Sequence, residues 1–348
     1  MAKIRNLALR DIPKLKKMIS MISNINSEEL YFGYKSYVPF PLNLANRLLP
    51  LSCKFASESY VAIDEEKLCG LVTLNAQAKN PQSWRISKLF LDENGYDTGR
   101  QLVSYAIAKY GAMGANTFSV KVDEHNEELL ELFSKGCGFR VCASEQLWKM
   151  EELKTVEQKT KNNILDKGFF RPFKNSDAKA VASLHNELIF PHFRYSVAKK
   201  SAEFENVVFN GLHKTTQFKY VIADSSRNSI KGYFCIQTND NENFVVDVDL
   251  VSAFDDYICD IISFSISQIM MRTKHFNLYF LNKKYQTNSA KFEKYLSENG
   301  FKNVKNQILL VKDYYKRISE QEKYTKPAIA FSEIPRKPAF KIPSESLR

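Results

Sequence analysis

The chain has 348 residues, of which 44% are hydrophobic and 26% are charged. This length exceeds that of a typical single domain, and the apolar content excludes disorder as the default state. The net charge of +11 indicates a lysine-rich surface and is compatible with an acidic protein or an anionic small molecule as partner. Because no recognition motif for nucleic acid accompanies the charge, we do not predict a nucleic-acid-binding protein.

The cysteines, the histidines and the start of the chain exclude further classes. Six cysteines form no CxxC pair and mostly have apolar neighbours, so we interpret them as reduced core thiols of a cytoplasmic protein. The five histidines are dispersed, and no metal site is predicted. We also expect no signal peptide and no membrane span, because the required apolar segments are missing.

The chain begins with a pattern that returns in its second half. Arg5 precedes Asp11 by six residues, and apolar residues at helical spacing follow. Arg171 and Asp177 repeat this arrangement 166 residues further on. In both places the pattern predicts a short strand, an aspartate that caps a helix, and an amphipathic helix.

Two further patterns recur in the same order. Residues 60–63 and 69–74 predict a hairpin, and residues 220–223 and 231–236 predict its counterpart. Each half then has a strand, an asparagine, an aromatic residue seven positions on, and a Gly-Phe pair five positions after that. The members are Asn126, Phe133 and Gly138-Phe139, and then Asn288, Tyr295 and Gly300-Phe301. Three matches at offsets of 160 to 166 residues predict a duplicated domain.

The repeat predicts the domain organisation. We place an N-terminal domain at residues 1–150, a polar linker at 151–167 and a C-terminal domain at 168–318. Residues 319–348 contain interleaved prolines and lysines and predict an extended basic tail without a core of its own.

On these residues, each half resembles a domain of the GCN5-related N-acetyltransferase (GNAT) superfamily, over about residues 3–150 and 168–315. The resemblance implies an α/β (α+β) fold of two tandem acyl-CoA N-acyltransferase domains. Each would have a mixed, mostly antiparallel sheet flanked by helices and splayed where the cofactor enters. It also implies acetyl-CoA or a related acyl-CoA as cofactor and an amine, on a small molecule or a protein, as acceptor.

Acyl transfer makes its own physical demands. Consecutive backbone N–H groups at a helix N-terminus are suited to the cofactor pyrophosphate. A base must keep the amine neutral, and a proton must reach the departing thiolate. In the family, a carboxylate serves as base, a tyrosine on the last helix serves as acid, and an asparagine at the start of that helix helps to position the cofactor.

In the first half, the resemblance implies a phosphate loop near residue 95. The implied cofactor-binding residues are Gly95, Tyr96, Thr98, Gly99, Arg100 and Asn126, together with Asn288 of the second half. Asn94 stands at a position that is basic or amide in the family. Asp97 replaces a glycine, so its carboxylate either repels the pyrophosphate or caps the helix.

The acid and base positions differ between the halves. Phe133 stands where the family has its tyrosine, and we interpret it as a core residue. Asp92 and Glu93 are candidate bases of the first half or ordinary surface carboxylates.

The second half keeps the acid position as Tyr295, although a half-buried structural tyrosine is an equal alternative. Asp247 and Asp249 lie two residues apart on one strand, so they share a face, and such a pair can raise the pKa of a carboxyl group. The loop that follows, residues 252–257, has no glycine and two acids, which disfavours a pyrophosphate.

Two hypotheses follow. The chain is an N-acetyltransferase that transfers an acyl group from acetyl-CoA to an unidentified amine. Alternatively, it is a non-catalytic tandem GNAT-fold protein, which binds an acidic protein partner through its basic surface and C-terminal tail. Tandem members of the family often keep only one working site, and the altered motifs in both halves are compatible with either hypothesis.

Overall fold

The structure is a computed structural model, and it describes residues 2–22, 25–27, 57–77, 80–93, 95–151, 170–206, 216–224 and 229–314. The proposed linker, the C-terminal tail and Asn94 lie almost entirely outside these residues. Among the residues that are described, no helix has the length and hydropathy needed to cross a membrane.

In the part of the first half that the structure describes, there are seven strands. They are β1 (Lys3–Asn6), β2 (Ile25–Ser27), β3 (Glu58–Asp64), β4 (Lys67–Gln77), β5 (Asn80–Leu91), β6 (Thr117–Asp123) and β7 (Arg140–Met150). Its helical segments are η1 (Leu9–Asp11), α1 (Ile12–Ile19), α4 (Tyr96–Ala112), α5 (Glu127–Glu131) and the π-helical turn η2 (Leu132–Gly136).

The second half repeats this order of elements. Its strands are β8 (Phe170–Pro172), β9 (Thr216–Asp224), β10 (Ser229–Thr238), β11 (Asn243–Leu250), β12 (Asn277–Lys283) and β13 (Phe301–Asp313). Its helices are α7 (Ala178–Leu188), α8 (Arg194–Val197), α9 (Ile258–Met270) and α10 (Ser289–Glu298), with short 3-10 turns η4 (Asn175–Asp177), η5 (Pro191–Phe193), η6 (Ser201–Glu203) and η8 (Ser252–Tyr257).

All of these strands belong to one sheet, in the order β1-β3-β4-β5-β6-β13-β7-β12-β11-β10-β9-β8, with β2 paired to β5. Within each half, the outer strands pair antiparallel. Each half then has one parallel pair, which is β5 with β6 in the first half and β11 with β12 in the second. The expected mixed, mostly antiparallel sheet flanked by helices is therefore confirmed, and the predicted repeat is visible in the order of the strands.

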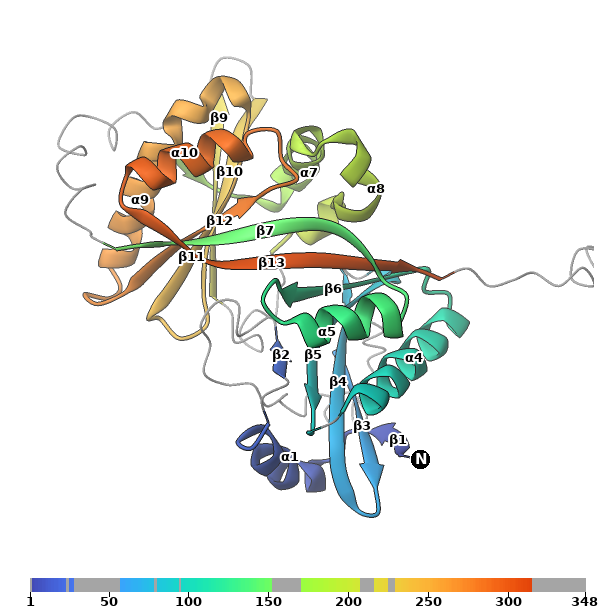
Figure 1. Cartoon of the computed structure of the whole chain (residues 1–348). Helices are drawn as coiled ribbons and strands as arrows, with labels where there is room; N and C mark the ends of the chain where they lie inside the picture. The colour runs from blue at the N-terminus through green and yellow to red at the C-terminus, as the bar shows by residue number, and fades with distance from the viewer. Residues whose placement is uncertain are drawn as a thin grey trace, which may run out of the picture. The chain divides into compact units, whose positions relative to one another are not determined.

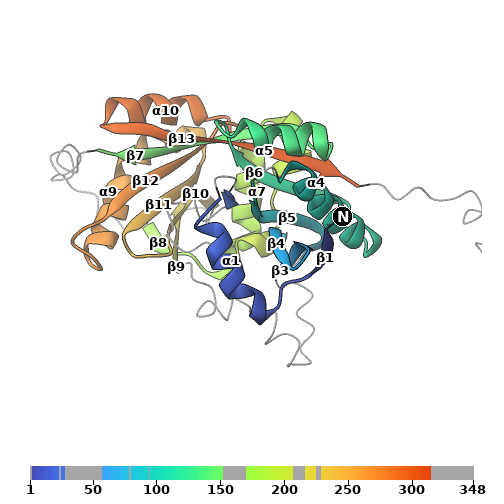
Figure 2. The ribbon, with the colours of Figure 1, turned by 60° about the horizontal axis from the view of Figure 1, so that its bottom comes forward.

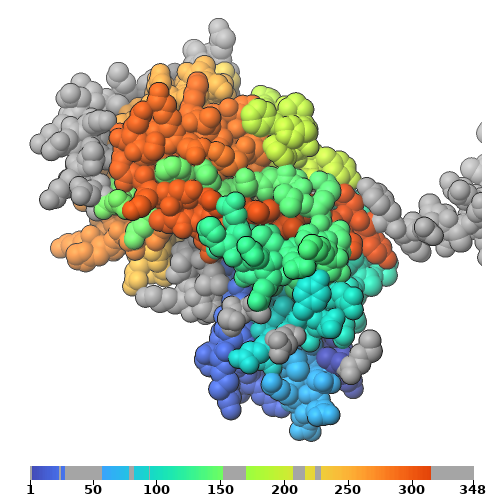
Figure 3. Space-filling view, viewed as in Figure 1, coloured from blue at the N-terminus to red at the C-terminus, as the bar shows by residue number. Residues whose placement is uncertain are grey.

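The last strand of each half pairs with the sheet of the other half. Strand β13 lies between β6 and β7, and β7 lies between β13 and β12 (Figure 1). The space-filling view shows the green residues of β7 running along the red residues of β13 (Figure 3). Each half thus completes its sheet with a strand from its counterpart. The exact boundaries of the two domains stay a prediction.

The helices cover the two faces of each half-sheet in the same way. In the first half, α4 packs on one face in a core with Tyr60 and Leu89, whereas α1 packs on the other face with Phe90. In the second half, α9 packs on one face with Val248, and α7 packs on the other face with Tyr233. Figure 2 shows the helices around the strands from a second direction. Successive strand residues alternate between the faces, which explains this distribution.

The repeated Arg and Asp form the same ion pair in both halves. Arg5 binds Asp11 through two nitrogens, each 2.7 Å from a carboxylate oxygen. Arg171 binds Asp177 in the same way at 2.8 and 2.9 Å. Each aspartate also accepts a backbone N–H three residues before it, which ties the strand to the start of the helix. This bidentate pairing explains the identical spacing in the two copies.

The repeated Gly-Phe pairs also have a structural reason. Gly138 and Gly300 have φ angles of +70° and +79°, a region that residues with a side chain rarely adopt. Each follows the last helix of its half and turns the chain into the final strand. The phenylalanines Phe139 and Phe301 then enter the cores of the first and second half.

The exchanged strands allow a test of the fold. Leu310 belongs to β13 of the second half, yet it is fully buried in the core of the first half. We expect Leu310→Ala to lower the free energy of unfolding by about 2–5 kcal/mol, because it leaves a cavity in that core. Urea unfolding measures this. Val304→Ala on the same strand, where the side chain is 49% exposed, is the control and is expected to change stability by less than about 0.5 kcal/mol. If both substitutions lowered the free energy of unfolding equally, this would contradict the burial of Leu310 in the first core and thus the exchange of β13.

Candidate functional site

Both halves open between their parallel strands. In the first half, the pairing of β5 with β6 ends where Ile86 lies beside Val120, and β5 continues to Leu91. In the second half, the pairing of β11 with β12 ends at Asp247, and β11 continues to Leu250. Beyond these points the two strands of each parallel pair are no longer hydrogen-bonded to each other. In the first half, Ile25–Ser27 of β2 pairs with residues 88–90 on the edge of β5 that β6 leaves. The parting of two parallel strands that the family resemblance implies is thus present twice, with β2 beside β5 in the first half.

The first half keeps a turn that is suited to an anionic ligand. Gly95 is the N-cap residue of α4, and it has no side chain that could accept from the N–H groups of the first turn. A Cβ atom on Gly95 would lie 2.7 Å from the carbonyl oxygen of Asp92 and from the Cβ of Leu91. Only glycine therefore fits this tight turn, and the N–H groups of α4 remain available to a phosphate.

Other residues of the predicted loop have packing roles. A Cβ on Gly99 would lie 2.8 Å from side-chain atoms of Leu132 and Leu91, so Gly99 permits close contact with the turn η2 and with β5. The methyl group of Thr98 packs near Gly70 of β4. Tyr96 is 42% exposed, and its ring extends from the start of α4 toward η2. Gly99 and Thr98 therefore serve packing within the first half.

Asp97 and Arg100 form an exposed ion pair with a separation of 3.4 Å. Asp97 lies in the first turn of α4 and not at its cap, which is Gly95. The capping role that the sequence suggested for Asp97 is therefore wrong. The repulsion that it exerts on a pyrophosphate is weakened by Arg100 and by solvent.

The candidate bases of the first half differ in their surroundings. Asp92 forms an ion pair with Lys67 at 2.6 Å, and this hydrogen bond lowers the pKa of the carboxyl group despite partial burial. Glu93 is exposed. Phe133 is fully buried in the core, as the sequence predicted. The paired Asp92 is a poor base because it holds its proton weakly.

Asn126 lies where the first half is hollow. Its Oδ1 accepts the backbone N–H of Leu129 at 3.1 Å and so caps α5. The same residue lines a cavity of about 540 Å³, together with residues of β2, β6, α5 and β13. The cavity therefore lies at the carboxyl end of β6, beside the splayed strands of the first half.

The corresponding region of the second half is closed by its own side chains. Asn288 donates to the backbone oxygen of Leu250 at 2.9 Å and to Asp255 at 3.4 Å. The buried carboxylate of Asp255 also accepts from Lys291 at 2.9 Å. These contacts join the end of β11 to the start of α10. An anionic ligand at this turn would meet the carboxylate of Asp255 and be repelled.

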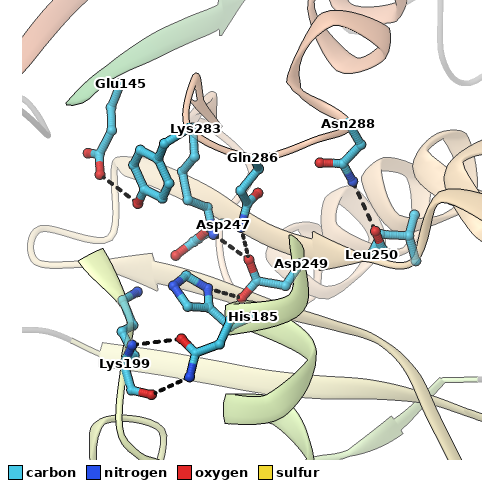
Figure 4. Close-up of polar contacts among 11 residues, drawn as sticks. Glu145, His185, Lys199, Asp247, Asp249, Leu250, Lys283, Gln286 and Asn288 are labelled. Atoms are coloured by element: carbon cyan, nitrogen blue, oxygen red, sulfur yellow. Dashed lines mark hydrogen bonds and ion pairs between the residues drawn. The ribbon is translucent and has the colours of Figure 1, made fainter. Parts of the chain in front are cut away.

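A buried ion cluster surrounds Lys283 (Figure 4). Its Nζ lies 2.5 Å from Asp247 and 2.6 Å from Asp249, so the two aspartates share a face, as predicted. Asp249 also accepts from Gln286 at 2.5 Å and contacts His185 Nδ1 at 2.9 Å. Both aspartates thus serve first as partners of a buried cation.

The predicted rise in carboxyl pKa is wrong for Asp249. Burial alone would raise its pKa, but His185 and Lys283 lower it well below the usual range. Burial opposes the charge of Lys283 as well, yet the two aspartates raise the pKa of its ammonium group. Asp249 and Lys283 are therefore both charged, and a carboxylate held by three donors is a weak base. The catalytic role of Asp247 and Asp249 stays a prediction that this arrangement does not favour.

His185 is the neutral member of the cluster. It is fully buried, and burial lowers its pKa, although Asp249 opposes the shift. A neutral imidazole that donates from Nδ1 to Asp249 leaves Nε2 as an acceptor, and this atom has no hydrogen-bond partner among the described residues. An Asp–His pair of this kind orients the ring, but enclosure in the core keeps Nε2 away from solvent.

Glu145 connects the exchanged strand to both halves. It lies on β7, accepts from Lys121 of β6 at 2.6 Å and accepts from Tyr285 of the second half at 3.1 Å. Burial would raise its pKa, but Lys121 lowers it. The carboxylate is therefore charged and its two bonds reinforce the exchange of strands.

Tyr295 lies apart from the two aspartates. Its ring packs against the core on the α9 face, whereas Asp249 faces α7. Burial and a hydrogen bond with Cys259 raise the pKa of its hydroxyl group, so the proton is retained at neutral pH. The three predicted catalytic residues do not converge on one point, and their roles stay predictions.

Sequence reasoning missed several residues that the fold brings together. His185, Lys283 and Gln286 belong to the ion cluster, while Asp123 and Gln307 line the cavity. The polar run from residue 123 to residue 128, directly after a strand, was a usable signal for the cavity. Gln307 carried no such signal, because it reaches the cavity only through the exchange of β13.

Comparison with solved structures identifies the fold. A tandem GNAT protein from the clavulanic acid biosynthesis pathway, solved without acetyl-CoA, matches with a TM-score of 0.57 and 10% identity, over 91% of this chain and 100% of that protein. A GCN5-related N-acetyltransferase from Sphaerobacter thermophilus matches with a TM-score of 0.54 and 10% identity, over 91% and 97% of the two chains. The chain has the fold of tandem GNAT acetyltransferases, as the sequence predicted.

The other comparisons found no match: no family model and no curated protein is similar to this sequence.

The neutral state of His185 predicts a pH dependence of stability. The unfolded chain takes up a proton at this histidine near pH 6.5, whereas the folded chain does not. The free energy of unfolding therefore falls as the pH is lowered through this value, by up to about 1.4 kcal/mol per pH unit. We expect His185→Gln to reduce this slope in urea unfolding between about pH 5 and pH 7. His275→Gln, which replaces an exposed histidine, is the control. A slope that is unchanged in His185→Gln would show that this residue is already protonated in the fold.

Proposed function

We propose that the chain is an acyl-CoA-dependent N-acyltransferase whose cofactor binds to the first half. The observation that supports this most is the difference between the two splayed pairs of strands. The first is bordered by a cavity and by the turn at Gly95, an N-cap residue without a side chain. The second is bridged by Asn288 and contains the carboxylate of Asp255.

The pyrophosphate would bind to the N–H groups of the first turn of α4, which begins after Gly95. The thioester would then extend toward Asn126 and the cavity, along β2. Residues Ile25–Ser27 of β2 pair with β5 on the side from which β6 diverges, and they line that cavity. The second half would serve as a scaffold that supplies β13.

The reaction joins the acceptor nitrogen to the acyl carbon and breaks the carbon–sulfur bond. The nitrogen loses one proton, and the thiolate of CoA gains one. Phe133 cannot supply this proton, so we infer that the exchange passes through solvent at the open cavity. The missing acid lowers the expected rate, because general acid catalysis typically contributes about 100-fold or more.

The proposal is tested first by calorimetric titration of the full chain with acetyl-CoA, with ATP as the control ligand. We expect binding with a micromolar dissociation constant, about −8 kcal/mol. We further expect Asp97→Asn to tighten binding a few-fold, because it removes a negative charge beside the phosphates.

Asp256→Asn is the matched control, since Asp256 is an exposed acid in the corresponding loop of the second half. Its affinity for acetyl-CoA is expected to equal that of the unchanged protein. If Asp256→Asn alone alters the affinity, the cofactor belongs to the second half. Absence of binding at millimolar acetyl-CoA would reject the proposed function.

A further inference from the structure

Strand β2 is a feature of the first half that the second half does not repeat. It occupies the edge of β5 that β6 leaves, and Asn26 lies directly opposite Leu89. Among the described strands of the second half, none occupies the corresponding edge of β11 beyond Asp247. The first half therefore has an additional strand where its parallel strands part, and this strand lines the cavity of about 540 Å³.

The side-chain amide of Asn26 is available to a ligand in this cavity. The residue is only 7% exposed, and its amide makes no hydrogen bond with any described residue. Both amide atoms nevertheless keep accessible surface, whereas the Oε1 of Gln307 is sealed. Because Asn26 is otherwise buried and lines the cavity, this surface faces the cavity. A ligand that enters can therefore form a hydrogen bond with Asn26.

A second amide of the same cavity has a free donor end. The Oδ1 of Asn126 accepts the backbone N–H of Leu129 at 3.1 Å, which leaves Nδ2 without a partner among the described residues. Asn126 also lines the cavity. Amide N–H donors thus reach the cavity from β2, which pairs with β5, and from the turn that follows β6.

The charges around the cavity disfavour an anionic ligand. Asp123 pairs with Lys305 at 3.1 Å, so these two charges offset each other. Glu127 and Glu128 are exposed carboxylates that also line the cavity, and they would repel a carboxylate or a phosphate inside it. The amide donors therefore fit a neutral carbonyl oxygen better than a charged group.

We propose that Asn26 donates a hydrogen bond from Nδ2 to the carbonyl oxygen of the acyl thioester. This inference rests on the proposed function, which brings the thioester to this cavity. As the acceptor nitrogen bonds to the acyl carbon, an electron pair of the carbonyl moves onto the oxygen. It returns when the carbon–sulfur bond breaks and the thiolate leaves. A donor at this oxygen stabilises the transient negative charge.

The fold holds Asn26 in place before a ligand binds. Its neighbour Ile25 packs against the core beneath α1, and its other neighbour, Ser27, is 4% exposed. A fixed donor needs little reorganisation when charge develops on the oxygen. Since Phe133 cannot donate a proton, stabilisation of this oxygen is a contribution that the side chains of the first half can still make.

The test compares acetyl-CoA with CoA, which lacks the acyl carbonyl, in calorimetric titrations of the full chain. Asn26→Leu preserves the approximate size of the side chain and removes its donor. We expect this change to weaken acetyl-CoA binding about fivefold, the contribution of one neutral hydrogen bond, and to leave CoA binding unchanged. Asn6→Leu is the matched control, because Asn6 is also a strand asparagine and does not line the cavity.

Infrared spectroscopy gives a readout that a purely structural role of Asn26 does not alter. A hydrogen bond weakens the C=O bond, so the carbonyl stretch of bound, isotope-labelled acetyl-CoA is expected at higher wavenumber in Asn26→Leu than in the unchanged protein. Asn26→Asp preserves the size and polarity of the side chain and serves if Asn26→Leu does not fold. Its carboxylate cannot donate, and the same upward shift is expected.

The outcomes separate this inference from the proposed function. Equal weakening of acetyl-CoA and CoA binding in Asn26→Leu, or an unchanged carbonyl stretch, would overturn the inference and leave the function intact. Tighter binding of both ligands would show that β2 obstructs the cofactor, which overturns the inference as well. If the unchanged protein binds neither ligand, the proposed function is rejected and the role of Asn26 with it.

Discussion

The exchange of final strands between the halves is the constraint on which the rest of the structure depends. Since β13 pairs with β6 and β7 pairs with β12, neither half completes its own sheet. The backbone groups of these central strands must be hydrogen-bonded, because an unpaired edge in a buried sheet is costly. Leu310 enters the first core and Trp148 enters the second, so the two cores also share their side chains. The halves therefore fold as one unit across the exchanged strands.

The two halves differ in how their polar residues are paired. At the junction, Glu145 on β7 contacts Lys121 of the first half and Tyr285 of the second half. In the second half the polar residues pair with one another around Lys283, and Asn288 bridges the ends of the strands. Such a buried cluster is only weak evidence for stability, because desolvation offsets much of the attraction. The cluster around Lys283 and the Asn288 bridge fill the part of the second half that corresponds to the cavity of the first half.

The repeat could be recognised in the sequence because its residues make contacts that are local along the chain. Arg5 with Asp11, and Arg171 with Asp177, are close in sequence, and their bidentate pairing needs one spacing. Gly138 and Gly300 are required by a positive φ angle at the end of a helix. Less of the candidate site could be predicted from the sequence. Gly95 was found through the resemblance, whereas the partners of Asp249 come from α7, from β12 and from the segment that follows β12. The pKa of Asp249 was predicted in the wrong direction because the sequence does not show that Lys283 lies between the aspartates.

The sequence by itself determined the duplicated order of strands and helices, the fold that this order implies, and the turn at Gly95. These follow from hydrophobic periodicity, turn residues and pairs that are close along the chain, which act over short distances. The tertiary structure alone decided that the last strands are exchanged, that the second splayed pair is closed, and that Gln307 reaches a cavity of the first half. Those features depend on contacts between residues that are distant in sequence, and neither spacing nor composition specifies which of several equivalent strands will pair.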